Sequence, residues 1–459
     1  MTLQTTQTVN VFVPTGALGV GIDEADVAAA IRSDIHAIAC DAGSTDSGPA
    51  YLATGRAKYS RAAIKEELRI LMKAQAVAKV PLLIGSCGTS GSDTALDWTH
   101  EIALEVAHEE RLRPKIAALY SEQSPQRMAQ LASDGRIRSL APQLEVRPQL
   151  FEQCDHIVAL MGPEPYLAAV EAGADIVLGG RTSDPAVLAA VPLMLGAGAG
   201  AAWHAGKTAE CGALCSTRPR NGGVLVRVGC SDFLVEPVSR TNACTPASVS
   251  RHMLYENSDP WRLYEPGGVL DVTECRYEPL DGRVVRVSGS RFEAMPYTMK
   301  LEGAAAVGFQ TLMLVGIQDP IVLANVDRFL DKMLHTLVER TARVLDLAPQ
   351  DFSISLRPYG WNAVSGHVVR SGDWLPREVG LLFVATAQDQ ETANQIAKTC
   401  NPWFFHLPLE EDQELPSYAF PFSPAEVPKG AVYEFKLNHV VQVATADELV
   451  RSSIARVAT

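Results

Sequence analysis

The stretch Val80-Pro-Leu-Leu-Ile-Gly-Ser-Cys-Gly-Thr-Ser-Gly-Ser-Asp93 begins as a short apolar run, becomes a loop of small and hydroxyl-bearing residues, and leads into a helical pattern over residues 95–110. Three other loops of this kind follow apolar runs, at residues 13–21, 41–49 and 179–185. In an open parallel sheet, ligands bind beyond the carboxyl ends of the strands, where free N–H groups and helix N-termini favour anions. The four loops therefore predict one polar site that accepts an anion.

Apolar runs and helical patterns alternate over the first two hundred residues. Alternation at this spacing predicts an α/β fold, with a doubly wound, mostly parallel sheet covered by helices on both faces. We expect this domain to span residues 1–221. The apolar runs are 9–13, 36–40, 81–84, 116–120, 157–161 and 176–178, and the helical patterns are 24–31, 61–78, 95–110, 125–133, 164–172 and 185–195.

The pattern changes after residue 221. Residues 222–305 show mainly period-two alternation, which predicts a β-rich insertion or subdomain. Residues 306–459 show the order β-α-β-β-α-β, which predicts a ferredoxin-like α+β domain. The aromatic segment Pro402-Trp-Phe-Phe-His406 is expected in a long connection buried between subunits, so we expect a homo-oligomer.

Composition restricts the class of protein. The net charge is −13 and there is no basic run, which argues against nucleic-acid or acidic-membrane binding. The first residues lack a signal-peptide pattern, and the nine cysteines are scattered, so we expect free thiols in the cytoplasm. The stretch 186–202, broken by Pro192, predicts a packed helix and loop. Metal-ligand spacings are missing, and no metal site is predicted.

The second loop carries Asp41, Ser44, Thr45 and Asp46. Two carboxylates near one crevice can divide the acid and base roles of a reaction if their environments separate their pKa values. Asp46 alternatively closes a local Asx turn. Both interpretations are open at this point.

The third loop carries Ser86, Cys87, Thr89 and Ser90. A thiol at a helix N-terminus is a candidate nucleophile because its pKa is lowered there. The alternative, which we favour, is that the hydroxyls cap the helix and bind an anion while Cys87 fills space, because no His–Asp pair accompanies it.

The fourth loop reads Gly179-Gly-Arg-Thr-Ser-Asp-Pro185. Arg181 is expected to hold a carboxylate or phosphate by a bidentate contact, with Thr182 and Ser183 beside it. Asp184 is expected to cap the following helix, in which Pro185 suits the first turn. A salt bridge across the loop is the alternative for Arg181.

A further polar segment gathers His204, Lys207, Glu210, Cys211 and Cys215. Glu210 is not required by helix or strand packing, and a carboxylate there could move a proton at a carbon next to a carbonyl. A structural ion pair is its alternative role.

The first loop, Thr15-Gly-Ala-Leu-Gly-Val-Gly21, resembles a dinucleotide fingerprint, and Asp41 lies where an acidic residue would bind a ribose hydroxyl. Its G-x-x-G-x-G spacing differs from the G-x-G-x-x-G order. A glycine turn used for packing alone is the alternative to binding NAD(P).

Several motifs together resemble the acyclic terpene utilisation AtuA family: residues 175–187, the segment Ala209-Glu-Cys-Gly-Ala213, Tyr255-Glu-Asn-Ser-Asp-Pro260 and Tyr264-Glu-Pro-Gly-Gly-Val269. The resemblance covers most of residues 9–315. The family name implies catabolism of acyclic terpene acids through CoA thioesters. The second loop departs from the family pattern, which indicates a branch distinct from the terpene-acid members.

The first hypothesis is therefore a cytoplasmic catabolic enzyme that acts on a small carboxylic acid or its CoA thioester by lyase or hydratase/isomerase chemistry, without a cofactor. Arg181 and the hydroxyl loops would hold the anion, and Glu210, or Asp41 with Asp46, would move the proton. The alternatives are an NAD(P)-dependent oxidoreductase, a thiol hydrolase or transferase built on Cys87 or Cys211, and a non-catalytic subunit of an acyl-CoA-processing complex.

Overall fold

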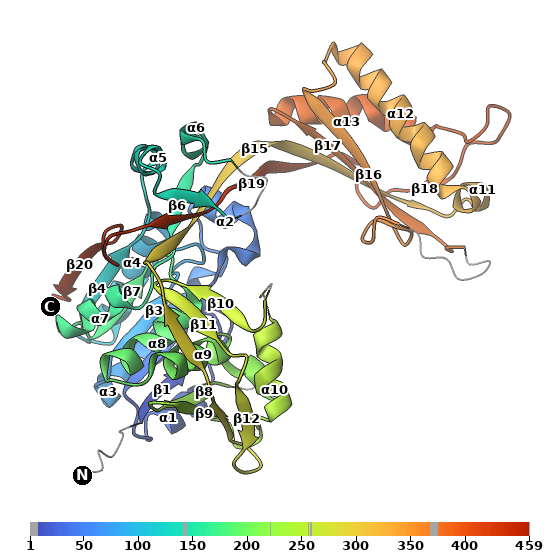
Figure 1. The fold of residues 1–459 in the computed structure, drawn as a ribbon. Coiled ribbons are helices and arrows are strands. Elements are labelled where there is room, and N and C mark those ends of the chain that lie inside the picture. Colours follow the sequence, from blue (N-terminus) through green and yellow to red (C-terminus); the bar gives the residue numbers. More distant parts are fainter. Residues whose placement is uncertain are drawn as a thin grey trace, which may run out of the picture. The chain divides into compact units, whose positions relative to one another are not determined.

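The computed structural model describes residues 8–140, 145–220, 222–255, 257, 259–367 and 375–458 (Figure 1). It divides into two compact units. The first runs to Ala305 and resumes at Phe435, and the second runs from Ala306 to Glu434. The chain leaves the first unit within strand β15 (Thr298–Ile317) and returns to it within β19 (Val427–Gln442). The end of the chain, assigned above to the C-terminal domain, belongs to the first unit.

A mixed ten-stranded sheet forms the centre of the first unit among the described residues. Its central strands β1, β2, β3, β7 and β4 are neighbours in that order and are parallel, as the alternation predicted. The other neighbouring pairs in the sheet are antiparallel. In order, the strands are β12 (Arg276–Pro279), β13 (Val285–Ser288), β9 (Asp232–Pro237), β8 (Val224–Val228), β1 (Val9–Val13), β2 (Ala37–Asp41), β3 (Leu82–Gly85), β7 (Ile176–Gly179), β4 (Lys115–Tyr120) and β20 (Arg451–Arg456).

Helices cover both faces of this sheet because successive strand side chains point to opposite faces. Phe12, Ile38 and Ile84 join one buried cluster, with α1 (Glu24–Ala30), α3 (Arg61–Ala78) and α4 (Asp93–Glu109). Their neighbours Val11 and Leu83 join the other cluster. That cluster includes the helices α5 (Pro125–Ser133), α7 (Glu164–Glu171), α8 (Asp184–Met194) and α9 (Ala199–Ala209), together with residues of α6 (Pro148–Glu152) and α10 (Pro246–Arg251). The doubly wound arrangement is thus confirmed for the parallel centre.

Most of the β-rich segment extends this sheet instead of forming a separate subdomain. Strand β8 pairs with β1, and β9, β13 and β12 follow outward. Only β10 (Arg262–Glu265), β11 (Gly268–Asp271) and β14 (Arg291–Ala294) form a small sheet of their own within the described segment. Helix α10 (Pro246–Arg251) and the short helix η3 (His252–Leu254) lie between β9 and β10 in the sequence.

One expectation within the first unit was wrong. The apolar run at 157–161 becomes β6 (His156–Ala159), which pairs antiparallel with β15 outside the parallel sheet. Its apolar composition could not distinguish the two locations, because a strand in either sheet buries the same kind of side chain. The helix expected over 185–195 is confirmed: α8 contains Pro192 and ends two residues later, at Met194.

The second unit has the strand order β16-β17-β15-β19, with β16 (Phe352–Tyr359) and β17 (Val379–Ala387). With α12 (Val326–Leu345) and α13 (Gln390–Phe405), this gives the expected β-α-β-β-α-β order of elements. The aromatic segment at 402–406 is not a loop, because α13 extends to Phe405 and Phe404 is buried in the core of this unit. No helix in the described part of the chain is both long and apolar enough to cross a membrane.

Candidate functional site

The predicted loops meet at the carboxyl edge of the parallel strands. Neighbouring strands β3 and β7 are followed by helices that cover opposite faces of the sheet, α4 on one and α8 on the other. In open α/β sheets, ligands bind beyond the strand ends at such a point. The third and fourth loops lie there, and the second loop follows the adjacent strand β2, so we call the place where these three loops meet the strand-end region.

The third and fourth loops are held together by backbone hydrogen bonds. Ser86 N donates to Gly180 O at 3.0 Å, and Arg181 N donates to Gly91 O at 3.1 Å. Gly91 has a φ of +66°, and a Cβ there would lie 2.2 Å from Arg181 N. The close approach of two loops about ninety residues apart in the sequence thus requires glycine at this position.

Replacing Gly91 by Ala should destabilise the fold by about 2–3 kcal/mol, because the added methyl group separates the loops. Gly135 offers a matched control: its φ is +72°, but no atom lies within 4 Å of the place that an added methyl group would occupy. Gly135→Ala should cost only about 1 kcal/mol, the cost of the left-handed backbone alone. Chemical denaturation of both variants measures the difference, and equal losses would show that loop contact is unimportant.

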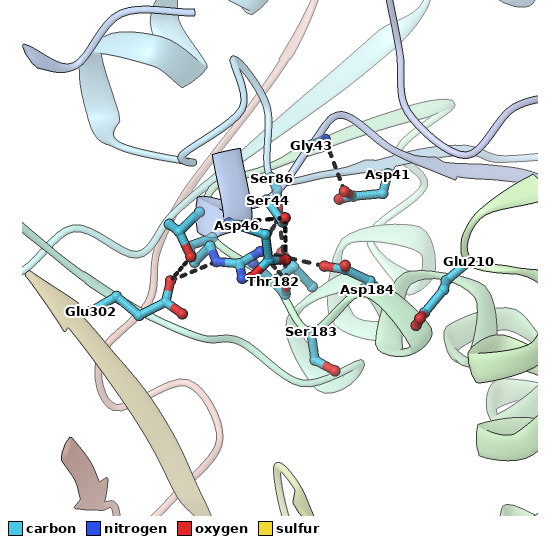
Figure 2. Close-up of polar contacts among 12 residues, drawn as sticks. Asp41, Gly43, Ser44, Asp46, Ser86, Thr182, Ser183, Asp184, Glu210 and Glu302 are labelled. Atoms are coloured by element: carbon cyan, nitrogen blue, oxygen red, sulfur yellow. Dashed lines mark hydrogen bonds and ion pairs between the residues drawn. The ribbon is translucent and has the colours of Figure 1, made fainter. Parts of the chain in front are cut away.

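Arg181 is the centre of a buried ion network, and Figure 2 labels its two carboxylate partners, Asp184 and Glu302. Its Nε donates to Glu302 Oε2 at 2.9 Å, and one terminal nitrogen lies 3.3 Å from Asp184 Oδ1. Glu302, on β15, also accepts from Thr45 Oγ1 at 3.0 Å and pairs with Lys300 Nζ at 2.9 Å. The guanidinium therefore already has two carboxylate partners, which agrees with the salt-bridge alternative for Arg181.

The network fixes the charge of Glu302. Burial alone would favour the neutral acid, but the charges of Arg181 and Lys300 outweigh it and lower the pKa of Glu302 to about 2. Glu302 is thus a permanent anion at neutral pH. The Glu302 carboxylate holds the Arg181 guanidinium in position, and this guanidinium also contacts Asp184.

Asp184 differs from Glu302 in its protonation. Burial, together with the charge of Glu210 and despite Arg181, raises the pKa of Asp184 to about 7. Asp184 was expected to be the helix cap. Instead Ser183 occupies the cap position, while Asp184 is the first residue of α8. Ser183 Oγ donates to Glu265 Oε2 at 2.5 Å, and burial raises the pKa of Glu265 to about 8.

Asp41 lies at the end of β2, with 3% of its surface exposed. Its Oδ2 accepts from Gly43 N at 2.8 Å, whereas its buried Oδ1 has no hydrogen-bond partner. Burial and the nearby charge of Asp184 raise the pKa of Asp41 well above its usual value. A neutral Asp41 would carry a proton that it can donate to a ligand.

The pH dependence of stability tests the environment of Asp184. A carboxyl group with a raised pKa binds more protons in the folded than in the unfolded state between about pH 4 and pH 7. Its contribution to stability is therefore lost as the pH rises through this window. Asp184→Asn should remove this loss, so the free energy of unfolding of the variant relative to the wild type should rise by about 2 kcal/mol between about pH 5 and pH 8. Urea titrations at both values measure it, and a pH-independent difference would contradict it.

Several predicted hydroxyls are used by the loops themselves. Thr182 Oγ1 bonds to Gly180 O and the hydroxyl of Tyr166, and Thr89 Oγ1 accepts from Lys58 N. Ser90 Oγ bonds to Ser92 Oγ at 3.5 Å. Ser86 Oγ accepts from Arg181 and joins the ion network. These hydroxyl groups therefore bond to other groups of the protein, and they fix the conformation of the loops.

Cys87 was the candidate nucleophile of the third loop, and its complete burial argues against that role. Its side chain is fully buried in the core between the sheet and α4, and its Sγ faces Ile84 O. Burial raises the pKa of its thiol, which opposes formation of the nucleophilic thiolate. This is the packing role that the sequence favoured.

Asp46 is exposed, and its carboxylate accepts a hydrogen bond from Ser44 Oγ at 2.5 Å. Ser44 Oγ also accepts from Asp46 N and so closes a short turn. Thr45, Asp46, Lys300 and Glu302 line a cavity of about 510 Å³. Lys300 also lines a second, mostly apolar cavity of about 500 Å³ that reaches Glu265. The ion network is therefore adjacent to space that a ligand can fill.

Two of the three glycines of the first loop already donate their N–H groups to a side chain. Gly19 N and Gly21 N donate to the two carboxylate oxygens of Glu67, at 2.6 and 2.7 Å. Glu67 lies on α3 and is buried. A dinucleotide phosphate would have to displace this carboxylate, so the loop agrees better with the packing alternative than with NAD(P) binding.

Glu210 and Cys211 follow α9. Figure 2 shows the side chain of Glu210 near Asp184, without a drawn contact to the ion network. Glu210 Oε1 accepts from Lys207 Nζ at 2.5 Å, and Glu210 is 3% exposed. Burial alone would lower the pKa of Lys207, but the charge of Glu210 outweighs this effect and raises it, so the lysine is protonated. The predicted Glu210 is thus in a buried ion pair, and Cys211 is partly exposed beside it.

Four residues of this region were not predicted from the sequence: Glu302, Lys300, Glu265 and His252. The first two interrupt the otherwise apolar strand 298–317, which was a detectable signal. Charged residues in a buried strand are costly and need partners. Glu265 and His252 carried no such signal, because each lies in a segment that resembles an exposed one.

The family model described as acyclic terpene utilisation family protein AtuA matches residues 41–217 and 232–409. The two segments cover well over half of the chain and include Asp41, Arg181, Asp184, Glu210 and Glu302. No curated protein and no solved structure gives a significant match.

Proposed function

The chain belongs to the acyclic terpene utilisation AtuA family, and from this premise we propose that it is a catabolic enzyme for a small carboxylic acid or its CoA thioester. We propose lyase or hydratase/isomerase chemistry, in which a proton is moved at a carbon next to a carbonyl. The observation that carries this proposal is the convergence of Asp41, Arg181 and Asp184 at the ends of β2 and β7, where Arg181 lies 3.3 Å from Asp184 and the charge of Asp184 acts on Asp41.

Asp184 is the proposed acid/base residue. A group with a pKa of about 7 can both accept and donate a proton near neutral pH, which is the condition for efficient general acid–base catalysis. Arg181, 3.3 Å from Asp184 Oδ1, keeps the carboxyl group oriented. Because Glu210 is already paired with Lys207, we assign the proton transfer to Asp184 in preference to Glu210.

Asp41 is the proposed hydrogen-bond donor to the substrate carbonyl. When a proton leaves the neighbouring carbon, negative charge develops on the carbonyl oxygen, and a buried neutral carboxyl group stabilises it. The unpaired Oδ1 of Asp41 supports this role. Lys300, which is 42% exposed and lines both cavities, is the proposed contact for the anionic group of the substrate.

A ligand panel tests the substrate class. The purified protein is heated with acyclic terpene acids, other mono- and dicarboxylic acids, their CoA thioesters, free CoA and NAD(P). A ligand at a hundred times its dissociation constant should add about 2.7 kcal/mol of stability. Stabilisation by acids or thioesters is the expected result. Stabilisation by NAD(P) alone would contradict the proposal and favour an oxidoreductase.

A further inference from the structure

Glu210, Cys211 and His252 bring three potential metal ligands together from two segments. Glu210 caps the end of α9, Cys211 follows it, and His252 begins η3. One ligand atom from each side chain lies within 4.8 Å of the other two. In the described part of the chain, no other three His, Cys, Asp or Glu side chains meet this spacing.

Two of these side chains have a buried polar atom without a hydrogen-bond partner. Glu210 Oε2 and His252 Nε2 are both in this state, and the residues are 3% and 4% exposed. They do not satisfy each other: His252 Nε2 lies 3.8 Å from Glu210 Oε1, which is too far for a hydrogen bond. Buried polar atoms without a partner are costly and rare in folded proteins, so two of them in neighbouring side chains point to a ligand.

The surrounding contacts orient Glu210 for this role. Lys207 holds Oε1 at 2.5 Å, which leaves Oε2 as the available oxygen. The backbone of Cys211 packs against Gly16, where a Cβ would lie 2.7 Å from the Cys211 carbonyl. The close approach of the first glycine loop thus fixes the position of the cysteine, while its partial exposure provides a route for an ion.

We propose that Glu210, Cys211 and His252 bind a zinc ion. A thiolate, an imidazole and a carboxylate are the ligand types that zinc takes in proteins, whereas magnesium and calcium prefer oxygen ligands alone. Three protein ligands leave the fourth tetrahedral position open for water or another ligand. The proposal goes beyond the function proposed above and does not depend on it, because zinc binding is measured without a substrate.

The test uses the full-length protein after removal of metal by a chelator and dialysis. Zinc is titrated in competition with a chromophoric chelator, and bound zinc is measured by elemental analysis. The wild type should bind one zinc per chain. Cys211→Ser and His252→Gln should each weaken binding by more than about 100-fold, since even residues that only support a ligand contribute about 10–100-fold. Cys230→Ser, which removes an exposed thiol elsewhere, is the matched control and should bind like the wild type.

Two further measurements on the wild type require no altered side chain. Cobalt in place of zinc should give a thiolate-to-metal charge-transfer band. Zinc should also protect Cys211, but not Cys230, from alkylation. Failure of the wild type to bind zinc, binding by Cys211→Ser as tight as that of the wild type, or a cobalt complex without the thiolate band would each overturn the proposal.

Discussion

Asp184→Asn is expected to lower turnover of the substrate found in the ligand panel by about 10²–10⁴-fold, the usual contribution of a general acid–base residue. The amide keeps the size of the side chain but cannot take up or release a proton. It also preserves a hydrogen-bond acceptor for Arg181, which lies 3.3 Å from Asp184 Oδ1. Steady-state kinetics should therefore show a loss in kcat with little change in KM.

The matched control is Asp23→Asn. Asp23 also stands at the start of a helix, as the N-cap of α1, and Asn caps helices as well as Asp does. This variant should retain wild-type turnover. If Asp184→Asn keeps more than about a tenth of the wild-type kcat, the role of Asp184 in proton transfer is wrong.

Arg181→Met is expected to lower the free energy of unfolding by about 3–5 kcal/mol, the cost of breaking a buried ion pair by removing one partner. Glu302, with a side-chain exposure of 5%, would keep only Lys300 as a charged partner within the described part of the chain. Asp184 would lose the one ion-pair partner that it has among the described residues. Urea denaturation at neutral pH measures the loss.

The double variant Arg181→Met/Glu302→Gln distinguishes the stability lost with the ion pair from the stability lost through other effects of the Arg181 substitution. Glu302→Gln removes the buried carboxylate that lacks Arg181 and should recover a large part of the stability. The double variant should therefore be more stable than the sum of the two single losses predicts. Strictly additive losses would show that Arg181 and Glu302 do not interact energetically. Both variants should be inactive if Arg181 positions Asp184.

The sequence was sufficient for the parallel centre of the fold, because each of β1, β2, β3, β4 and β7 is a short apolar run followed by a helical pattern. The sequence was insufficient to identify the neighbour of a strand wherever the same pattern of apolar residues fits two different neighbouring strands. The strand at His156 pairs with β15, and β20 returns to pair with β4 across more than three hundred residues. Period and composition report which face is buried, but not which strand lies alongside.

The candidate site was predictable to a similar extent. The loops that carry Asp41, Ser86 and Arg181 follow neighbouring strands, and the strand ends of a parallel sheet share one edge. The partners of their polar groups were not predictable. Glu302 and Arg181 form an ion pair although they are 121 residues apart in the sequence. Glu67 accepts hydrogen bonds from the first glycine loop, but it lies on a helix whose sequence pattern indicates only an amphipathic surface.

The most direct test of the central claim is hydrogen–deuterium exchange at the carbon next to the carbonyl of the bound substrate. The substrate identified by the panel is incubated in deuterated water with the wild type or with Asp184→Asn, and incorporation is followed by NMR. We expect enzyme-dependent incorporation with the wild type and its loss with Asp184→Asn. Absence of exchange with the wild type, or equal exchange with both proteins, would contradict the proposed role of Asp184.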